Sequence, residues 1–184
     1  MCRLPTTPSL SVLSSTDSAL SSPQPAKTLH IAARDGDIHT ILALVKQGAP
    51  IDERATSVKW TALHAAAALN NAVAVSVLLR HGADPNTYDI DGDTPLITAA
   101  SLGHTEVVQQ LVTKADLMRV SPRGETALHI AAEAGLDNIA SLLIARGGIE
   151  LVNARTNTGR TACDMARGNT EIVEMITAMK EAWI

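Results

Sequence analysis

A short amino-acid pattern that recurs about every 33 residues constrains this chain more than any other feature. Residues 126–135 read TALHIAAEAG, residues 61–70 read TALHAAAALN and residues 94–103 read TPLITAASLG. Shorter copies begin at Leu29 and Thr161, so that the leucine of the pattern, or Cys163 in its place, recurs at intervals of 32 to 35 residues. A period of this length indicates a repeat architecture, in which each unit buries its apolar side against its neighbours.

Each copy of the pattern predicts a short helix that begins at a threonine. The threonine hydroxyl can accept a hydrogen bond from a free backbone amide of the first turn, and small alanines follow it. The helix should end at a residue that tolerates a left-handed backbone, which is Gly36, Asn70, Gly103 or Gly135 in the first four units. A second helix with apolar residues at helical spacing follows, and then a turn such as DIDGDT at residues 89–94.

This pattern resembles the ankyrin repeat, and the resemblance covers residues 27–184. It implies an all-α fold, an ankyrin-repeat α-solenoid with short β-hairpin fingers between the helix pairs. We expect about five repeats, of which the first and the last are degenerate, at approximately 27–59, 60–92, 93–124, 125–159 and 160–184. The last helix, within residues 170–183, has a polar outer face that suits the cap of a stacked array.

Residues 1–26 form a different kind of segment, with seven Ser, four Pro and three Thr. Such a composition buries too little apolar surface to offset the entropy of ordering, so we predict a disordered tail. A transit peptide for an organelle is the alternative, because the segment is rich in Ser and poor in acids, although Arg3 is its one basic residue. The two cysteines, Cys2 and Cys163, form no disulfide framework. We therefore expect a cytoplasmic or nuclear protein.

The overall charge and hydropathy exclude two classes of partner. The net charge of −4 argues against nucleic-acid binding through bulk electrostatics, because such binding depends on Lys and Arg. No apolar run approaches the roughly 18 residues that a membrane-spanning helix requires. We expect a monomer that binds a protein partner and needs no cofactor.

The histidines of the pattern invite a metal or acid–base interpretation. His30, His64 and His129 recur at one position per repeat, but Ile97 and Asp164 interrupt the series. No second ligand lies at a spacing typical of metal sites. The ankyrin resemblance implies instead that each histidine joins neighbouring repeats by hydrogen bonds, and we predict no metal site.

Acidic residues gather on the turns. Asp89, Asp91 and Asp93 lie on one turn and Glu125 on the next, and carboxylates in such groups can bind a hard cation or act as acid and base. The spacing does not match a calcium loop, and the resemblance gives Asp89 a role in turn hydrogen bonds. A solvated acidic edge is the favoured interpretation, and we predict no catalytic residue.

The partner-binding surface is predicted from positions that the repeat leaves free. In ankyrin-like units, residues beside the finger glycine and before the helix-ending glycine line a concave face. Trp60 falls on such a finger, and tryptophan is enriched among the residues that dominate binding energies. The alternative is that Trp60 folds back over Val58 or Tyr88. The candidate partner-binding residues are Val58, Trp60, Leu69, Ile90, Asp91, Asp93, Leu102, Arg123 and Glu125.

The predicted function is a non-catalytic protein–protein interaction module, such as an adaptor, scaffold or regulator. A second hypothesis is a small-molecule-binding or enzymatic protein that uses the concave groove. In that case Trp60 and the acids Asp91, Asp93 and Glu125 would form one pocket around an organic substrate. Fold alone does not decide between the two functions.

Overall fold

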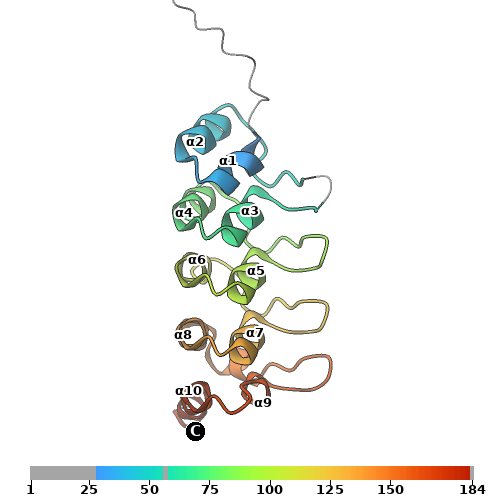
Figure 1. Cartoon of the computed structure of the whole chain (residues 1–184), viewed down its shortest axis with the longest axis vertical. Coiled ribbons are helices and arrows are strands. Elements are labelled where there is room, and N and C mark those ends of the chain that lie inside the picture. The colour runs from blue at the N-terminus through green and yellow to red at the C-terminus, as the bar shows by residue number, and fades with distance from the viewer. Residues whose placement is uncertain (1–27, 56–57, 183–184) are drawn as a thin grey trace, which may run out of the picture.

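The computed structural model describes residues 28–55 and 58–182, which form ten helices arranged in successive pairs (Figure 1). The predicted tail at residues 1–26 lies outside the described residues. The first helices of the pairs, called inner helices here, stack on one another. They are α1 (Leu29–Asp35), α3 (Ala62–Ala68), α5 (Pro95–Ser101), α7 (Ala127–Ala134) and α9 (Ala162–Met165).

The second helices form a parallel stack beside the first and are called outer helices. They are α2 (Ile38–Lys46), α4 (Ala72–Arg80), α6 (Thr105–Leu111), α8 (Asp137–Asn153) and α10 (Thr170–Glu181). Loops project from the side of the inner helices, away from the outer stack (Figure 1). The solenoid of helix pairs that the sequence predicted is therefore confirmed. None of the described helices has the length and apolar character needed to cross a bilayer.

Threonine begins every inner helix, as predicted. The side chains of Thr28, Thr61, Thr94, Thr126 and Thr161 each accept a hydrogen bond from the backbone amide three residues later. The residues predicted to end the first four inner helices all have a left-handed backbone. Their φ angles are 68° at Gly36, 57° at Asn70, 73° at Gly103 and 67° at Gly135.

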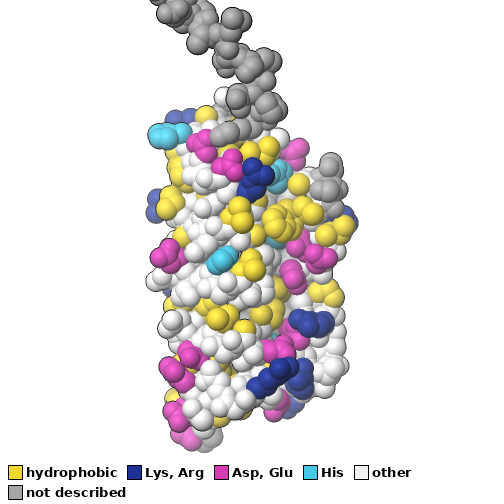
Figure 2. Space-filling model, viewed as in Figure 1, with side chains coloured by type: hydrophobic (Ala, Val, Ile, Leu, Met, Phe, Trp, Pro, Cys, Tyr) yellow, Lys and Arg dark blue, Asp and Glu magenta, His cyan; other side chains and the backbone are white. Residues whose placement is uncertain are grey.

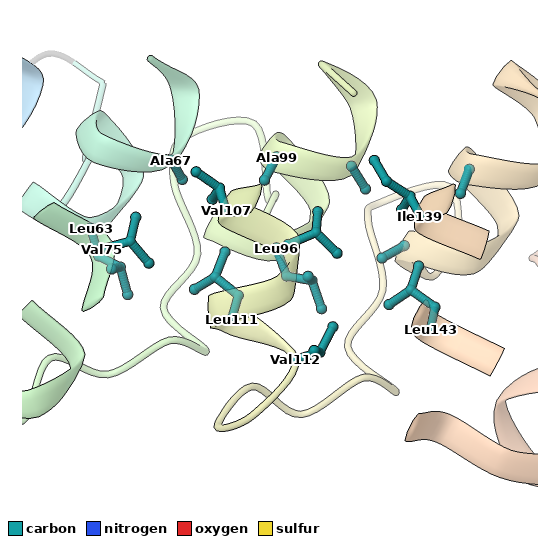
Figure 3. Packing of buried hydrophobic residues seen from close by; sticks show 14 of the residues in the cluster. Leu63, Ala67, Val75, Leu96, Ala99, Val107, Leu111, Val112, Ile139 and Leu143 are labelled. Carbon is teal, nitrogen blue, oxygen red and sulfur yellow. The ribbon is translucent and has the colours of Figure 1, made fainter. Parts of the chain in front are cut away.

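The core is a continuous row of small and branched side chains that runs through all the helix pairs. Ala67 and Ala99 lie where consecutive inner helices meet, and Val75, Val107 and Ile139 fill the space behind them (Figure 3). Because alanine side chains are small, neighbouring helices approach closely, and the interior is packed without large aromatic side chains.

The four projecting loops are called fingers one to four, and their described residues are 55 and 58–60, 89–93, 121–125 and 156–160. In each, the amide of the first residue donates to the carbonyl oxygen of the last, as from Asp89 to Asp93 at 3.0 Å, and the residue before the last donates back to the first, as from Gly92 to Asp89 at 3.3 Å. The β-hairpins that we expected are not present as strands within residues 28–55 and 58–182. The two bonds close a tight turn and do not continue into a ladder.

The segment before the fourth finger differs from the expectation of a turn after each second helix. α8 extends to Asn153 with a non-helical Gly148 (φ 60°, ψ −159°) inside it. Leu151 and Val152 are buried in the core. The residues after Gly148 therefore form a helical turn that buries apolar surface.

Polar side chains also join each helix end to the next repeat. The Asn71 side-chain amide donates to the carbonyl oxygens of Ala33 and Arg34 at 3.0 and 2.7 Å, at the end of α1. His104 Nε2 lies 3.1 Å from the Ala68 carbonyl oxygen at the end of α3. His104 is half-buried between two repeats. These contacts satisfy carbonyl groups that a helix end leaves unpaired.

Candidate functional site

The pattern histidines hold the fingers against the inner helices. His64 Nδ1 accepts from the Thr61 amide at 3.2 Å, and its Nε2 lies 3.3 Å from the carbonyl oxygen of Asp93 in the next finger. His129 repeats the arrangement, with its Nε2 3.1 Å from the Ala154 carbonyl oxygen and 3.2 Å from that of Arg160. His30 Nε2 contacts the carbonyl oxygens of Glu53 and Trp60 at 2.7 and 2.9 Å. The predicted structural role of these histidines is confirmed.

Burial favours the neutral form of two of these histidines. The rings of His64 and His129 are fully buried, and desolvation lowers the pKa of each below its ordinary value. A neutral ring has one donor and one acceptor nitrogen, and the threonine amide at Nδ1 with the carbonyl oxygen at Nε2 matches the tautomer that carries its hydrogen on Nε2. No group of three or more His, Cys, Asp or Glu side chains in the described part of the chain is placed to hold a metal ion.

Trp60 joins the first finger to the second. It is half-buried, and its indole nitrogen donates to Asp89 Oδ2 at 3.2 Å. The ring also borders a hollow of about 130 Å³ that Val58, Ala65 and residues of α1 line. Trp60 therefore neither projects freely into solvent nor simply folds over its own finger.

Asp89 serves the turn, as the resemblance implied. Its Oδ1 accepts from the backbone amides of Asp91 and Asp93, both at 2.9 Å, while Oδ2 binds Trp60. This leaves Asp91, which is exposed, and Asp93, which is half-buried, as the acids of the second finger that face outward. Burial first, and then the negative charges of Asp89 and Asp91, raise the pKa of Asp93.

Arg123 and Glu125 of the third finger form an ion pair. Arg123 Nη2 lies 2.8 Å from Glu125 Oε2, and the glutamate side chain is only 6% exposed while that of Arg123 is 73% exposed. A partner in solution would therefore meet the guanidinium rather than the carboxylate. Asp91, Asp93, Arg123 and Ser101 line a second hollow, of about 270 Å³, between the fingers and the inner helices.

Four predicted apolar residues lie on the surface of three successive repeats. Val58 is 38% exposed, Leu69 54%, Ile90 55% and Leu102 53%. A backbone hydrogen bond of 3.1 Å from Ile90 to Val58 joins their fingers. Leu69 and Leu102 follow the adjacent helices α3 and α5 at equivalent positions.

The surface between the fingers and the inner helices, with its two hollows, is called the groove from here on. Of the nine predicted residues, five line these hollows, namely Val58, Trp60, Asp91, Asp93 and Arg123, and three more are exposed, namely Leu69, Ile90 and Leu102. Glu125 is buried and paired with Arg123. Trp60 borders one hollow, while Asp91 and Asp93 border the other. Trp60 and the acids of the enzymatic hypothesis therefore do not share either of these two hollows. Ser57, another residue considered for this face, lies outside the described residues.

The left-handed backbone of Lys59 was not predicted from the sequence. This residue occupies the finger position where later units have glycine, and its backbone is left-handed with a φ of 53°. A residue with a side chain is uncommon in this conformation, and such strain concentrates at functional sites. The sequence could have indicated this conformation, because the first finger has Lys59 at the position where the other fingers have glycine.

Comparisons with known proteins identify the repeats independently. The family model for ankyrin repeats, in three copies, matches residues 29–121 and 113–182. Human "SH3 and multiple ankyrin repeat domains protein 2" is 33% identical over 83% of this chain. A rice protein named as a probable E3 ubiquitin-protein ligase, XBOS33, is 39% identical over 62%, and human "ARF GTPase-activating protein GIT1" is 34% identical over 47%. The chain spans only 10%, 22% and 11% of these relatives.

Proposed function

Because the chain belongs to the ankyrin-repeat family, we propose that it is a non-catalytic protein-interaction module that binds a partner protein through the groove. Ankyrin repeats are protein-interaction modules, and the proposal adds which face of this chain binds the partner. The exposure of Val58, Leu69, Ile90 and Leu102 supports it most strongly. Grouped apolar side chains on a surface are typical of a site where another molecule removes them from water.

The hydrogen bonds beneath the groove give this surface a fixed shape. His30 and Trp60 tie the first finger to its neighbours, and Asp89 ties the second. A preformed surface loses little conformational entropy on binding, which favours affinity. We further propose a monomer in the cytoplasm or nucleus, a setting in which the free, half-buried Cys163 stays reduced.

A difference capture experiment tests the proposal. The full chain and its Leu102→Glu variant are used as bait in a lysate of the source organism, and retained proteins and small molecules are identified by mass spectrometry. Val73→Glu is the matched control, because Val73 is 65% exposed but lies on outer helix α4. We expect a protein that the parent and the control retain and that Leu102→Glu loses.

Either of two other results would contradict the proposal. A protein that all three baits retain equally would place binding on another face. A small molecule that only Leu102→Glu fails to retain, without any protein partner, would favour the ligand-binding or enzymatic hypothesis. Circular dichroism of each variant checks that the helices are intact, so that loss of binding is not loss of fold.

A further inference from the structure

The chemical type of the side chains that face the groove changes from one finger to the next along the stack. The residue before each inner-helix threonine is Trp60, Asp93, Glu125 and Arg160 in fingers one to four. The residue on the other side of the left-handed turn position is Val58, Asp91, Arg123 and Thr158. Apolar side chains thus occupy these positions in the first finger and acids in the second, while the third has Arg123 beside the buried Glu125 and the fourth has Arg160 and Thr158.

The surface view shows the same order. Yellow side chains gather at the level of α3 and the first finger, magenta ones lie below them, and dark blue ones lie lower still (Figure 2). The apolar portion consists of the four exposed residues already described, Val58, Leu69, Ile90 and Leu102. The acidic portion follows at once, because Ile90 and Asp91 are consecutive on the second finger.

The acids of the second finger form no ion pair within 4.0 Å in the described part of the chain. Arg123, which is paired with Glu125, lines the same hollow and offsets the charges of these acids only in part. The crowding of Asp89, Asp91 and Asp93 and the burial of Asp93 together raise the pKa of Asp93. A cation placed here would relieve this repulsion. The hollow of about 270 Å³ beside these acids gives a side chain room to enter.

Charge complementarity and the adjoining apolar surface together define the occupant. We propose that the groove binds a segment of a partner protein that places an apolar side chain against Val58, Ile90 and Leu102 and a lysine or arginine side chain at Asp91 and Asp93. This inference rests on the proposed function, because it assigns the chemistry of the partner at the same face.

The dimensions of the stack set an expected spacing. Packed helices lie about 8–10 Å apart, so one repeat step along the groove has roughly that length. An extended chain covers about 3.3 Å per residue. An extended partner segment with its apolar anchor at Val58, one repeat before Asp91 and Asp93, would therefore carry its basic residue about three positions away.

A peptide selection tests this directly. A phage-displayed library of random 12-residue peptides is selected against the full chain. Enriched sequences are then made synthetically, and their affinity is measured by fluorescence anisotropy. We expect peptides with a large apolar residue and a Lys or Arg about three positions away. Their affinity for the Asp91→Asn/Asp93→Asn variant should be at least tenfold lower than for the parent. This difference should be smaller at high salt, where ion pairs are screened.

The matched control removes the same charge elsewhere. Glu106→Gln/Glu174→Gln changes two exposed acids on the outer helices α6 and α10 and should leave peptide affinity unchanged. A double-mutant cycle between the peptide's basic residue, replaced by Gln, and Asp93→Asn isolates the pairwise contact. We expect the two substitutions together to weaken binding less than the product of their separate effects.

The outcomes separate this inference from the proposed function. Peptides that lose binding to Leu102→Glu, but carry no basic residue or respond equally to Asp91→Asn/Asp93→Asn and its control, would overturn the charge assignment and leave the groove as the interface. A selection without any peptide that depends on Leu102 would overturn both.

Discussion

The first and third fingers close in the same way but tolerate different residues at the turn. In each, the first residue of the finger donates a backbone hydrogen bond to its last residue, at 2.8 Å from Ala55 to Trp60 and at 2.9 Å from Ser121 to Glu125. The left-handed position is Lys59 in the first and Gly124 in the third. The turns differ in length, because the amide of Lys59 reaches back four residues to Ala55 and that of Gly124 reaches back three to Ser121. The residue type at this position therefore depends on the turn and on what lies beside it.

The neighbour of the third finger explains its glycine. A Cβ atom added to Gly124 would lie 2.6 Å from the backbone nitrogen of Asn157 in the fourth finger, closer than real Cβ atoms approach. The Asn157 amide also donates to the Arg123 carbonyl oxygen at 3.2 Å, so the two fingers cannot separate without losing this bond. Glycine is required here by contact as well as by conformation.

The largest expected effect comes from breaking that contact. We predict that Gly124→Ala lowers the free energy of unfolding by about 2–5 kcal/mol, because left-handed strain and overpacking add. Gly159→Ala is the control, since Gly159 has a similar φ of 77° but a Cβ atom there would meet nothing within 4 Å, so it should cost about 1–2 kcal/mol. Urea denaturation measures both. Equal costs would show that the contact with Asn157 contributes nothing.

A smaller effect of opposite sign is expected in the first finger. Lys59→Gly should raise the free energy of unfolding by about 0.5–1 kcal/mol, because relief of left-handed strain exceeds the extra entropy of glycine in the unfolded chain. Asn70→Gly, at a φ of 57°, should gain less, since asparagine tolerates this conformation. Thermal melts compare the two, and a Lys59→Gly variant no more stable than the parent would refute strain at this turn.

The smallest effect concerns Asp93, which takes the place of Trp60 in the second finger. Its raised pKa means that ionisation costs the folded state more than the unfolded chain, so stability falls as pH rises through this range. Asp93→Asn should therefore stabilise the protein at pH 7, by about 0.2–1 kcal/mol after solvent screening. The gain should vanish near pH 3, where aspartate is protonated in both states. Urea midpoints at the two pH values measure it, and an equal gain at both would contradict this origin.

Much of the fold could be predicted because the repeat fixes what happens inside each unit. The threonine caps, the left-handed helix ends and the bridging histidines all follow from residues within one copy of the pattern. The strand-free fingers could not be predicted, because a tight turn and a short hairpin share the same residues. The helical extension at residues 147–153 depended on whether Leu151 and Val152 could reach the core.

The site was predicted less fully because its properties arise between units. The positions of Val58, Leu69, Ile90 and Leu102 followed from the repeat. The bond between Trp60 and Asp89 joins side chains from different fingers, and their approach depends on the rotation from one repeat to the next. The burial of Glu125 under Arg123 likewise depends on side-chain rotamers, which sequence spacing does not determine.

The contacts that Asn71 and His104 make with preceding helix ends also affect how the protein responds to mechanical load. Each of these links reaches back only one repeat, and no described contact of this kind skips a unit. Tension applied to the two ends would therefore be carried in series, and the weakest junction would open first. A rupture there would expose helix-end carbonyls on one neighbouring repeat only. The solenoid would therefore unfold one repeat at a time, and it could refold from the repeats that stayed folded.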